Sequence, residues 1–285
     1  MSRKLLLTLS PESEAKLIAG ARNTVPVSGL THNFYKYPAR FSPEFARAAI
    51  EAFTQPGDLV LDPYVGGGTT LVEARAMGRH SLGTDISQLA EFVSKAKTSI
   101  LEKRGASAWQ MGRWAETASE AINIHRSSSP HEKYAELGYH KHLNHASRWR
   151  LRKAIEQALD SAEELPSRKM QDFARCVVLR TAQWALDGRK SLPSTSEFRH
   201  AICSYASEML VGATAFRKEV RRQEVAGRVT QINRSAEGLD SDKNIKGRTA
   251  PIDRTSFGPT CWLRFATTHY LRTARAGATH GDTLS

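Results

Sequence analysis

Cysteine and long apolar runs are both scarce in this sequence. The three cysteines, Cys176, Cys203 and Cys261, are widely spaced and form no C-x-x-C pair, so neither a zinc site nor a disulfide framework is expected. No apolar run approaches the ~18 residues of a membrane span, and the apolar stretch near the N-terminus is too short for a secretion signal. We therefore expect a cytoplasmic protein with reduced thiols and no bound metal.

Acidic residues are also in short supply. The 29 Asp and Glu residues face 41 Lys and Arg residues, which leaves a formal net charge of +12. Such an excess favours polyanions such as DNA or RNA, although the same composition also fits a surface whose basic side chains are simply solvated. A cluster of histidines at 131, 140, 142 and 145 lacks a carboxylate to complete a metal site, and we interpret it as part of a basic surface helix.

The apolar pattern divides the chain into three regions. Residues 1–104 mix short strand-like runs with amphipathic helices and should form the cofactor-binding part of an α/β core. Residues 105–225 are almost wholly helical in pattern and are predicted to be a large helical insertion, a candidate contact for DNA. Residues 226–285 are expected to hold one more core strand, Gly227–Asn233, followed by a poorly ordered tail in which the periodicity fades.

The stretch from Leu59 to Ser87 carries the strongest signal. A short apolar run ends in Asp62, a loop with three successive glycines (66–68) follows, and a helical pattern then leads to a second strand that ends in Asp85. This β-loop-α-β layout, with an acid at the carboxyl end of each strand, is typical of a nucleotide-type cofactor site. The glycines allow the backbone to approach a ligand closely, and N–H groups in such a loop can face a carboxylate or phosphate.

Two common ligands of such loops do not fit. The dinucleotide pattern G-x-G-x-x-G fails because Leu71 stands at the third glycine position, and the Walker pattern fails because Thr69 follows Gly68 where lysine is required. An acid before the loop disfavours a pyrophosphate and favours a cofactor with a cationic amino-acid end. S-adenosylmethionine fits, with Asp62 beside a positive group and Asp85 on the ribose hydroxyls.

Three motifs resemble those of a known family. Residues 62–70, DPYVGGGTT, resemble the D-P-F-x-G-x-G-T-T motif of the amino-group DNA methyltransferases, which modify cytosine N4 or adenine N6. Residues 32–41, HNFYKYPARF, resemble the H-x-Y-P-A-K-F element that precedes it in that family. Residues 83–87, GTDIS, resemble the following motif, G-x-D-I-[SN]. The three motifs lie within residues 31–98 in the family's order.

The resemblance implies a Rossmann-like methyltransferase core that binds S-adenosylmethionine and methylates an exocyclic amino nitrogen of double-stranded DNA, with cytosine N4 favoured over adenine N6. The setting would be restriction–modification, with a restriction endonuclease as a possible partner, or orphan methylation. Aromatic faces in the 32–41 element, such as Phe34 or Tyr37, would lie against the sulfonium or serve only in packing. The implied cofactor-binding residues are Asp62, Pro63, Tyr64, Gly66, Gly68, Thr69, Asp85, Ile86, Phe34 and Lys36.

One element of that family is absent. Methylating a base amine requires a flipped base and acceptors that hold its N–H groups, a task that falls in this family to an [SDN]-P-P-[YFW] loop. No two prolines are adjacent in this chain, and residues 250–270, where the loop is expected, read APIDRTSFGPTCWLRFATTHY. The catalytic residues are therefore unknown, and we predict a chain with impaired catalysis.

Three explanations of this absence stay open. A frameshift or truncation would make the tail from about residue 240 foreign to the fold. A split enzyme would carry the loop on a second methylase fragment. A divergent site would use residues such as Asn244, Asp253 or Tyr270.

Two other functions also fit the motifs. An RNA methyltransferase would modify tRNA but not DNA, whereas a non-catalytic nucleic-acid-binding protein would bind DNA in a salt-dependent way regardless of cofactor.

Overall fold

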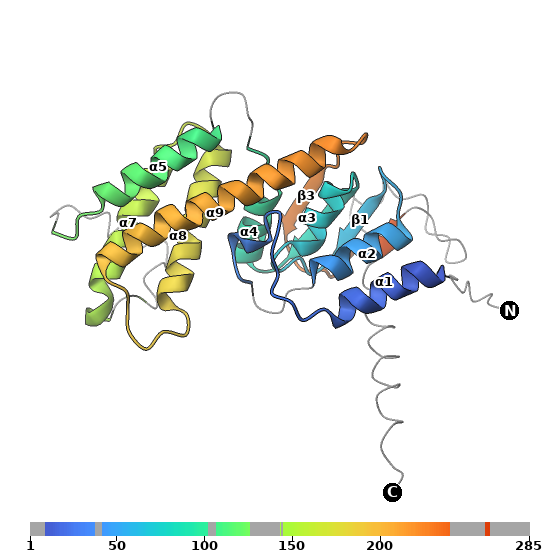
Figure 1. The fold of residues 1–285 in the computed structure, drawn as a ribbon, viewed down its shortest axis with the longest axis horizontal. Helices are drawn as coiled ribbons and strands as arrows, with labels where there is room; N and C mark the ends of the chain where they lie inside the picture. The colour runs from blue at the N-terminus through green and yellow to red at the C-terminus, as the bar shows by residue number, and fades with distance from the viewer. Residues whose placement is uncertain are drawn as a thin grey trace, which may run out of the picture. The chain divides into compact units, whose positions relative to one another are not determined.

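The computed structural model describes residues 9–37, 42–101, 107–125, 143, 145–239 and 260–262, with Ser107 and the last three residues as backbone only. These residues form helices and a four-stranded parallel sheet (Figure 1), as expected for a mixed α/β chain. The chain divides into two compact units. We call residues 1–27, 37–98 and 218–285 the sheet unit, and residues 28–36 and 99–217 the helical unit.

The sheet has the strand order β3-β2-β1-β4, and each neighbouring pair is parallel. The sheet unit contains α1 (Pro11–Arg22), α2 (Pro43–Phe53), β1 (Leu59–Asp62), α3 (Thr69–Ala76), β2 (His80–Asp85), α4 (Gln88–Thr98), β3 (Val229–Asn233) and β4 (Thr260–Trp262). Because all four strands are parallel, their carboxyl ends lie at one edge of the sheet, and the segments that follow β1 and β2 meet there.

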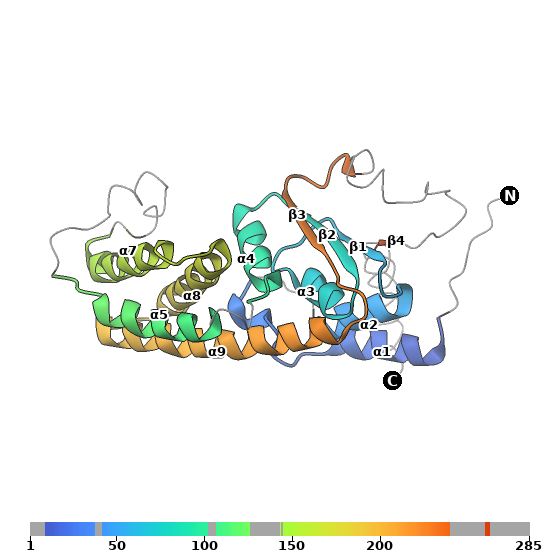
Figure 2. The same cartoon turned by 90° about the horizontal axis from the view of Figure 1, so that it is seen from above.

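The two faces of β1 contribute to two different apolar clusters. Val60 is fully buried in a cluster with residues of α1, α2 and α3, and Figure 2 shows these three helices on one side of the strands. Leu61, the next residue, points to the other face and packs with Leu82 of β2 and with Leu239. This alternation is what a strand buried on both faces requires.

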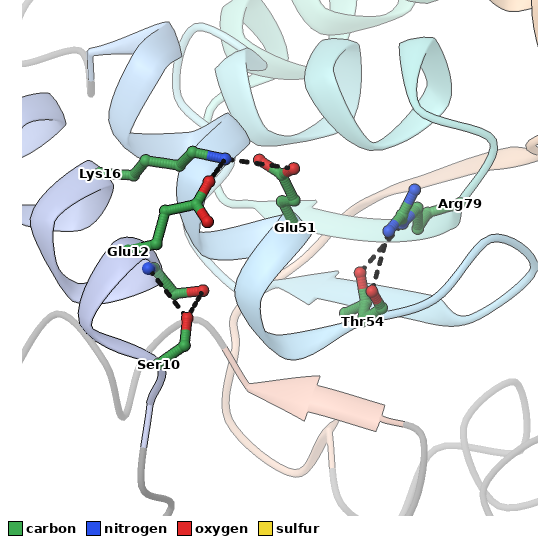
Figure 3. Close-up of polar contacts among 7 residues, drawn as sticks. Ser10, Glu12, Lys16, Glu51, Thr54 and Arg79 are labelled. Atoms are coloured by element: carbon green, nitrogen blue, oxygen red, sulfur yellow. Dashed lines mark hydrogen bonds and ion pairs between the residues drawn. The ribbon is translucent and has the colours of Figure 1, made fainter.

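The same three residues, Ser-Pro-Glu, begin both α1 and α2. In α1 the hydroxyl of Ser10 accepts the backbone N–H of Ser13, and in α2 the hydroxyl of Ser42 accepts that of Phe45, while proline occupies the first helical position of each. Lys16 of α1 lies 3.1 Å from Glu12 and 3.6 Å from Glu51 of α2 (Figure 3). The contact of Lys16 with Glu51 therefore joins the two helices.

The turn between α3 and β2 is held by a buried arginine. The guanidinium of Arg79 donates to both the hydroxyl and the carbonyl oxygen of Thr54, at 3.0 and 2.8 Å (Figure 3), and to the carbonyl of Met77 at 2.7 Å. Burial lowers the pKa of this guanidinium. Its three acceptors satisfy the charge, so Arg79 has a structural role at the end of the sheet opposite to Asp62 and Asp85.

The helical unit is built from η1 (His32–Phe34), α5 (Ser107–Ala121), η2 (Ala146–Arg148), α7 (Trp149–Glu163), α8 (Arg168–Leu186) and residues 195–217 of α9 (Thr195–Arg222). The buried face of α9 carries Phe198, Ile202, Met209 and Phe216, spaced by four or seven residues as one face of a helix requires. Cys176 of α8 is buried, and its thiol lies 3.7 Å from the carbonyl oxygen of Phe34. Among the described helices none combines the length and apolarity that crossing a bilayer demands.

The strand at 229–233 begins two residues after the predicted start at Gly227 and ends where predicted. A strand in the tail is not predicted by the sequence, yet Thr260–Trp262 pairs with Leu59–Leu61 of β1. Three residues of mixed polarity carry no period-two pattern, so only the pairing with β1 reveals this strand. The other residues of the predicted tail, and residues Asn244, Asp253 and Tyr270, lie outside the described part of the chain.

Candidate cofactor site

Two carboxylates lie at the carboxyl edge of the sheet, one after each central strand. Asp62 is the last residue of β1 and Asp85 the last of β2, and Asp62 is in register with Gly83. The glycine loop runs from the end of β1 into α3. The sequence therefore brings together an acid, a side-chain-free loop and a second acid, as the β-loop-α-β pattern predicts.

Asp62 is an acid whose charge is poorly solvated. Asp62 is only 7 % exposed to solvent, and its Oδ1 accepts the backbone N–H of Tyr64 at 3.0 Å. Burial raises the pKa of Asp62, and the nearby charge of Asp85 raises it further, while hydrogen bonds from Thr70 and Tyr64 act in the opposite direction. A cation placed at this position would offset both unfavourable effects, so the site favours a positively charged ligand.

Asp85 is held in one orientation by the backbone around it. Its Oδ2 accepts the N–H of Gly66 at 2.9 Å, and its Oδ1 accepts the N–H of Ser87 at 2.8 Å. Its carbonyl oxygen accepts two further bonds, from the side chain of Asn233 at 2.9 Å and from the backbone of Arg234 at 3.0 Å. Each carboxylate oxygen has a second lone pair, so Asp85 can still accept hydroxyl donors.

The glycine loop is a tight turn at the start of α3. The N–H of Gly68 donates to the carbonyl of Val65 at 2.8 Å, and Gly66 and Gly68 have φ values of 48° and 77°, in the left-handed region. A Cβ on Gly68 would lie 2.7 Å from Cβ of Ser94 in α4. Both the backbone conformation and the closeness of α4 therefore require glycine at 68.

Tyr37 is the aromatic residue of the 32–41 element that lies beside the loop. A Cβ on Gly66 would be 3.4 Å from Cε1 of the Tyr37 ring, and the tyrosine is only half-buried. The ring therefore borders the loop on the side of Gly66. Residues 38–41 of the same element lie outside the described residues, so this part of the predicted site is not visible.

Phe34 and Lys36 belong to the helical unit. The ring of Phe34 is 2 % exposed and packs edge-to-face on Phe173, with a centroid distance of 5.6 Å. The backbone N–H of Lys36 donates to the side chain of Gln183 at 3.1 Å, and that side chain donates back to the carbonyl of Lys36 at 2.9 Å. The described contacts of both residues are thus within the helical unit, and their role in cofactor binding stays a prediction.

Apolar side chains remain exposed at the edge where the two acids lie. Tyr64 follows Asp62 and Pro63 and is 61 % exposed, and Ile86 follows Asp85 and is 78 % exposed. Pro63 contributes its carbonyl, which accepts the hydroxyl of Thr84 at 3.1 Å, and Thr69 is buried as the first residue of α3. Flat apolar surface next to two acids is suited to a nucleoside, whose base is apolar on its faces and whose sugar carries hydroxyl groups.

Sequence reasoning missed one residue of this site, Lys97. It is fully buried in α4, and its Nζ donates to the carbonyl of Gly67 at 2.8 Å. The signal was available, because Ala90, Val93, Ser94 and Lys97 follow the i, i+3, i+4, i+7 pattern of a buried helix face. A lysine on that face marks a buried cation that must have a polar partner.

The chain is similar to known proteins over the segment that contains the glycine loop and both acids. A family model described as a DNA methylase matches residues 16–96. A Type II methyltransferase of Kocuria varians, M.MvaI, is 42 % identical over 76 residues, which is 26 % of this chain and 17 % of that protein. M.BsoBI of Geobacillus stearothermophilus is 38 % identical over 72 residues, 25 % of this chain and 14 % of that protein. M.SmaI of Serratia marcescens is 35 % identical over 98 residues, 33 % and 32 % of the two chains.

The matched segment contains strands β1 and β2, the glycine loop and the paired acids, whereas β3 and β4 lie outside it. No solved structure gives a significant match to the chain. Residues 16–96 are similar to the DNA methylases, in agreement with the family predicted from the three motifs. The chain spans 14–32 % of the length of the three relatives described above.

Proposed function

We propose that this chain is the cofactor-binding part of an enzyme that transfers a methyl group from S-adenosylmethionine to an exocyclic amino nitrogen of DNA. The observation that carries the proposal is the pair Asp62 and Asp85 around the glycine loop, inside the segment that matches the DNA methylases. Restriction–modification is the proposed setting, and the naming of the relatives as Type II methyltransferases supports it.

The fold proposed for the sheet unit is a Rossmann-like methyltransferase core. The order β3-β2-β1-β4 supports this proposal, because the central strand β1 has β2 on one side and the later strand β4 on the other. In open α/β sheets, ligands bind at the carboxyl ends of the strands where the strand order reverses. Asp62 lies at the carboxyl end of β1, next to that reversal, and this topology supports the proposed cofactor position.

The residues around the loop fit the chemical groups of S-adenosylmethionine. Its ammonium and sulfonium groups are the cations that a buried, unfavourably charged Asp62 would accept, and its ribose hydroxyls would donate to Asp85. The adenine would lie against Ile86. When bound, the cofactor supplies an electrophilic methyl group, and the protein's part is to hold the sulfonium end at a fixed place relative to the loop.

The proposed target is cytosine N4 in preference to adenine N6, as the resemblance of the motifs implies. Either amine is a weak nucleophile because its lone pair is delocalised into the base, so acceptors on its N–H groups must localise that pair. The chain has no [SDN]-P-P-[YFW] sequence to provide such acceptors. We therefore expect cofactor binding with weak or no turnover by this chain alone, and turnover restored by a second fragment that carries the loop.

The helical unit is the proposed contact for double-stranded DNA. Arginine side chains lie over aromatic rings at four places among its described residues. Two of them are Arg150, which is 5.4 Å from the centroid of Trp149, and Arg189, which is 4.1 Å from that of Trp184. Trp184 and Tyr205 line an open hollow of about 460 Å³. Guanidinium groups backed by aromatic rings are suited to phosphate and base contacts, and the net charge of +12 favours the same partner.

Two assays test the proposed function. Isothermal titration with S-adenosylhomocysteine is expected to show binding to the purified chain, and absence of binding would overturn the proposal. A labelled-methyl transfer assay on plasmid DNA is expected to show little or no transfer, and efficient turnover would overturn the predicted impairment. Transfer to tRNA but not DNA would instead identify an RNA methyltransferase, and salt-dependent DNA binding without any nucleoside binding would identify a non-catalytic binding protein.

A further inference from the structure

Lys97 presents its buried amino group to the glycine loop. The residue is fully buried in α4, and its Nζ donates to the carbonyl of Gly67 at 2.8 Å. Ser94, one turn earlier on the same helix, lies against Gly68 so closely that a Cβ there would be 2.7 Å away. One face of α4 therefore underlies two successive residues of the loop.

The peptide between Gly67 and Gly68 is fixed at both ends by these contacts. Its carbonyl accepts from Lys97, and its N–H donates to the carbonyl of Val65 at 2.8 Å. A peptide unit is planar and trans, so holding both polar groups determines its orientation. Because Gly68 is the residue that precedes α3, the same contacts set the direction in which the first N–H groups of α3, which have no partner within the helix, are presented.

A carboxylate of the cofactor near the start of α3 would need a positive charge close to it. Asp62 suits the ammonium and sulfonium groups of S-adenosylmethionine, but the charges of both Asp62 and Asp85 repel its carboxylate. A positive charge hydrogen-bonded to the loop offsets that repulsion and adds to the positive end of the α3 dipole. The loop buries this charge away from water, where its field is less screened than at the surface.

We infer that Lys97 is a positioning residue for the carboxylate end of the cofactor, an inference that rests on the proposed function. It acts through the Gly67 carbonyl and through its charge, without touching the nucleoside. Its loss should therefore weaken ligands that carry the amino-acid carboxylate and leave those without it almost unchanged. A lysine that only supports the fold would affect both kinds of ligand alike.

The test compares two nucleosides on the same proteins. S-adenosylhomocysteine carries the amino-acid end, whereas 5′-methylthioadenosine has the same thioether nucleoside without it. In Lys97→Met we expect the affinity for S-adenosylhomocysteine to fall about tenfold or more, and that for 5′-methylthioadenosine to change less than about twofold. Lys95→Met, an exposed lysine of the same helix, is the matched control and should leave both affinities within about twofold.

Two further variants keep the inference testable if methionine disturbs folding, which circular dichroism and thermal unfolding would reveal. Lys97→Gln keeps a donor for the Gly67 carbonyl without the charge and should show the same selective loss, and Lys97→Arg should restore most of the preference for S-adenosylhomocysteine. Equal losses for both nucleosides, no loss, or neutral variants that all fail to fold would overturn the inference. A wild-type chain that binds neither nucleoside would instead overturn the proposed function.

Discussion

The carboxylate of Asp85 accepts the backbone N–H of Gly66 at 2.9 Å, so the end of β2 is tied directly to the loop that follows β1. The contact joins residues that are distant in sequence and places the second acid beside the turn. It also means that Asp85 has two roles, since the group that would bind ribose hydroxyls also shapes the loop. A change at Asp85 should therefore affect the loop as well as the ligand.

Replacing Asp85 with alanine should lower the affinity for S-adenosylhomocysteine about 10- to 100-fold, since hydrogen bonds to a charged group contribute about 1.5–3 kcal/mol. Titration calorimetry measures the loss. Asp58→Asn is the matched control, because Asp58 precedes β1 at the opposite edge of the sheet and its carboxylate accepts the N–H of Gln55. Equal effects of the two variants would contradict the placement of the ribose at Asp85.

Asp62→Asn should stabilise the ligand-free protein while it weakens the cofactor. Burial and the charge of Asp85 both raise the pKa of Asp62, so ionising this carboxyl costs free energy in the folded state. That cost is present above the raised pKa and disappears below the ordinary aspartate value near 3.9, where the carboxyl is protonated whether folded or unfolded. Thermal unfolding at pH 7 should show a higher Tm for Asp62→Asn, and a lower Tm would contradict this account.

The same pKa shift predicts how cofactor affinity varies with pH. A cationic ligand favours ionised Asp62, so binding should release a proton near the raised pKa and the affinity should fall as pH decreases through it. This fall should begin at a higher pH than an ordinary aspartate would produce. Asp62→Asn should remove this part of the pH dependence, and calorimetry from pH 4 to pH 8 would show whether it persists.

Gly68→Ala should destabilise the sheet unit more than Gly57→Ala. Both glycines have positive φ values, 77° and 92°, so alanine introduces backbone strain of about 1–2 kcal/mol at either position. At Gly57 the nearest atom to a new Cβ is 3.9 Å away, whereas at Gly68 Cβ of Ser94 would be at 2.7 Å. Urea unfolding of the two variants measures the difference in the free energy of unfolding. Equal losses would contradict this prediction, because they would mean that α4 moves away from the new Cβ at little cost.

The two aromatic candidates of the 32–41 element should behave differently. Tyr37→Ala removes the half-buried ring that borders Gly66, and we expect a several-fold loss of cofactor affinity with a small change in stability. Phe34→Ala leaves a cavity beside Phe173 and should destabilise the chain by about 3–5 kcal/mol. If folded Phe34→Ala selectively lost cofactor binding, the prediction of Phe34 as a cofactor residue would be supported instead.

The local pattern of residues 43–98 predicts nearly all of the sheet unit's early elements. Apolar residues at helical spacing over Pro43–Phe53 predict a helix there, and these are the bounds of α2. Strands β1 and β2 end at the predicted acids, because buried parallel strands are short apolar runs between a turn and a loop. The amphipathic pattern of residues 88–103 predicts a longer helix than α4, which ends at Thr98. Periodicity indicates the helix but not its last turn, which depends on capping contacts.

Contacts between distant segments could not be predicted in this way. Tyr37 borders the glycine loop within the sheet unit, whereas Phe34 belongs to the helical unit, and the pattern of alternating aromatic residues carries no information about this division. The sequence alone does not distinguish Lys97 from the exposed Lys95 of the same helix, because it does not say which face of α4 contacts the glycine loop. Strand β4 is too short to show a pattern and is specified by its pairing with Leu59–Leu61.

Direct titration of S-adenosylmethionine into the folded wild-type chain and into Asp62→Ala and Asp85→Ala tests the central claim most simply. The account predicts saturable heat for the wild type, with an affinity reduced about tenfold or more in each variant. No heat with the folded wild type, or the same affinity in all three proteins, would contradict it.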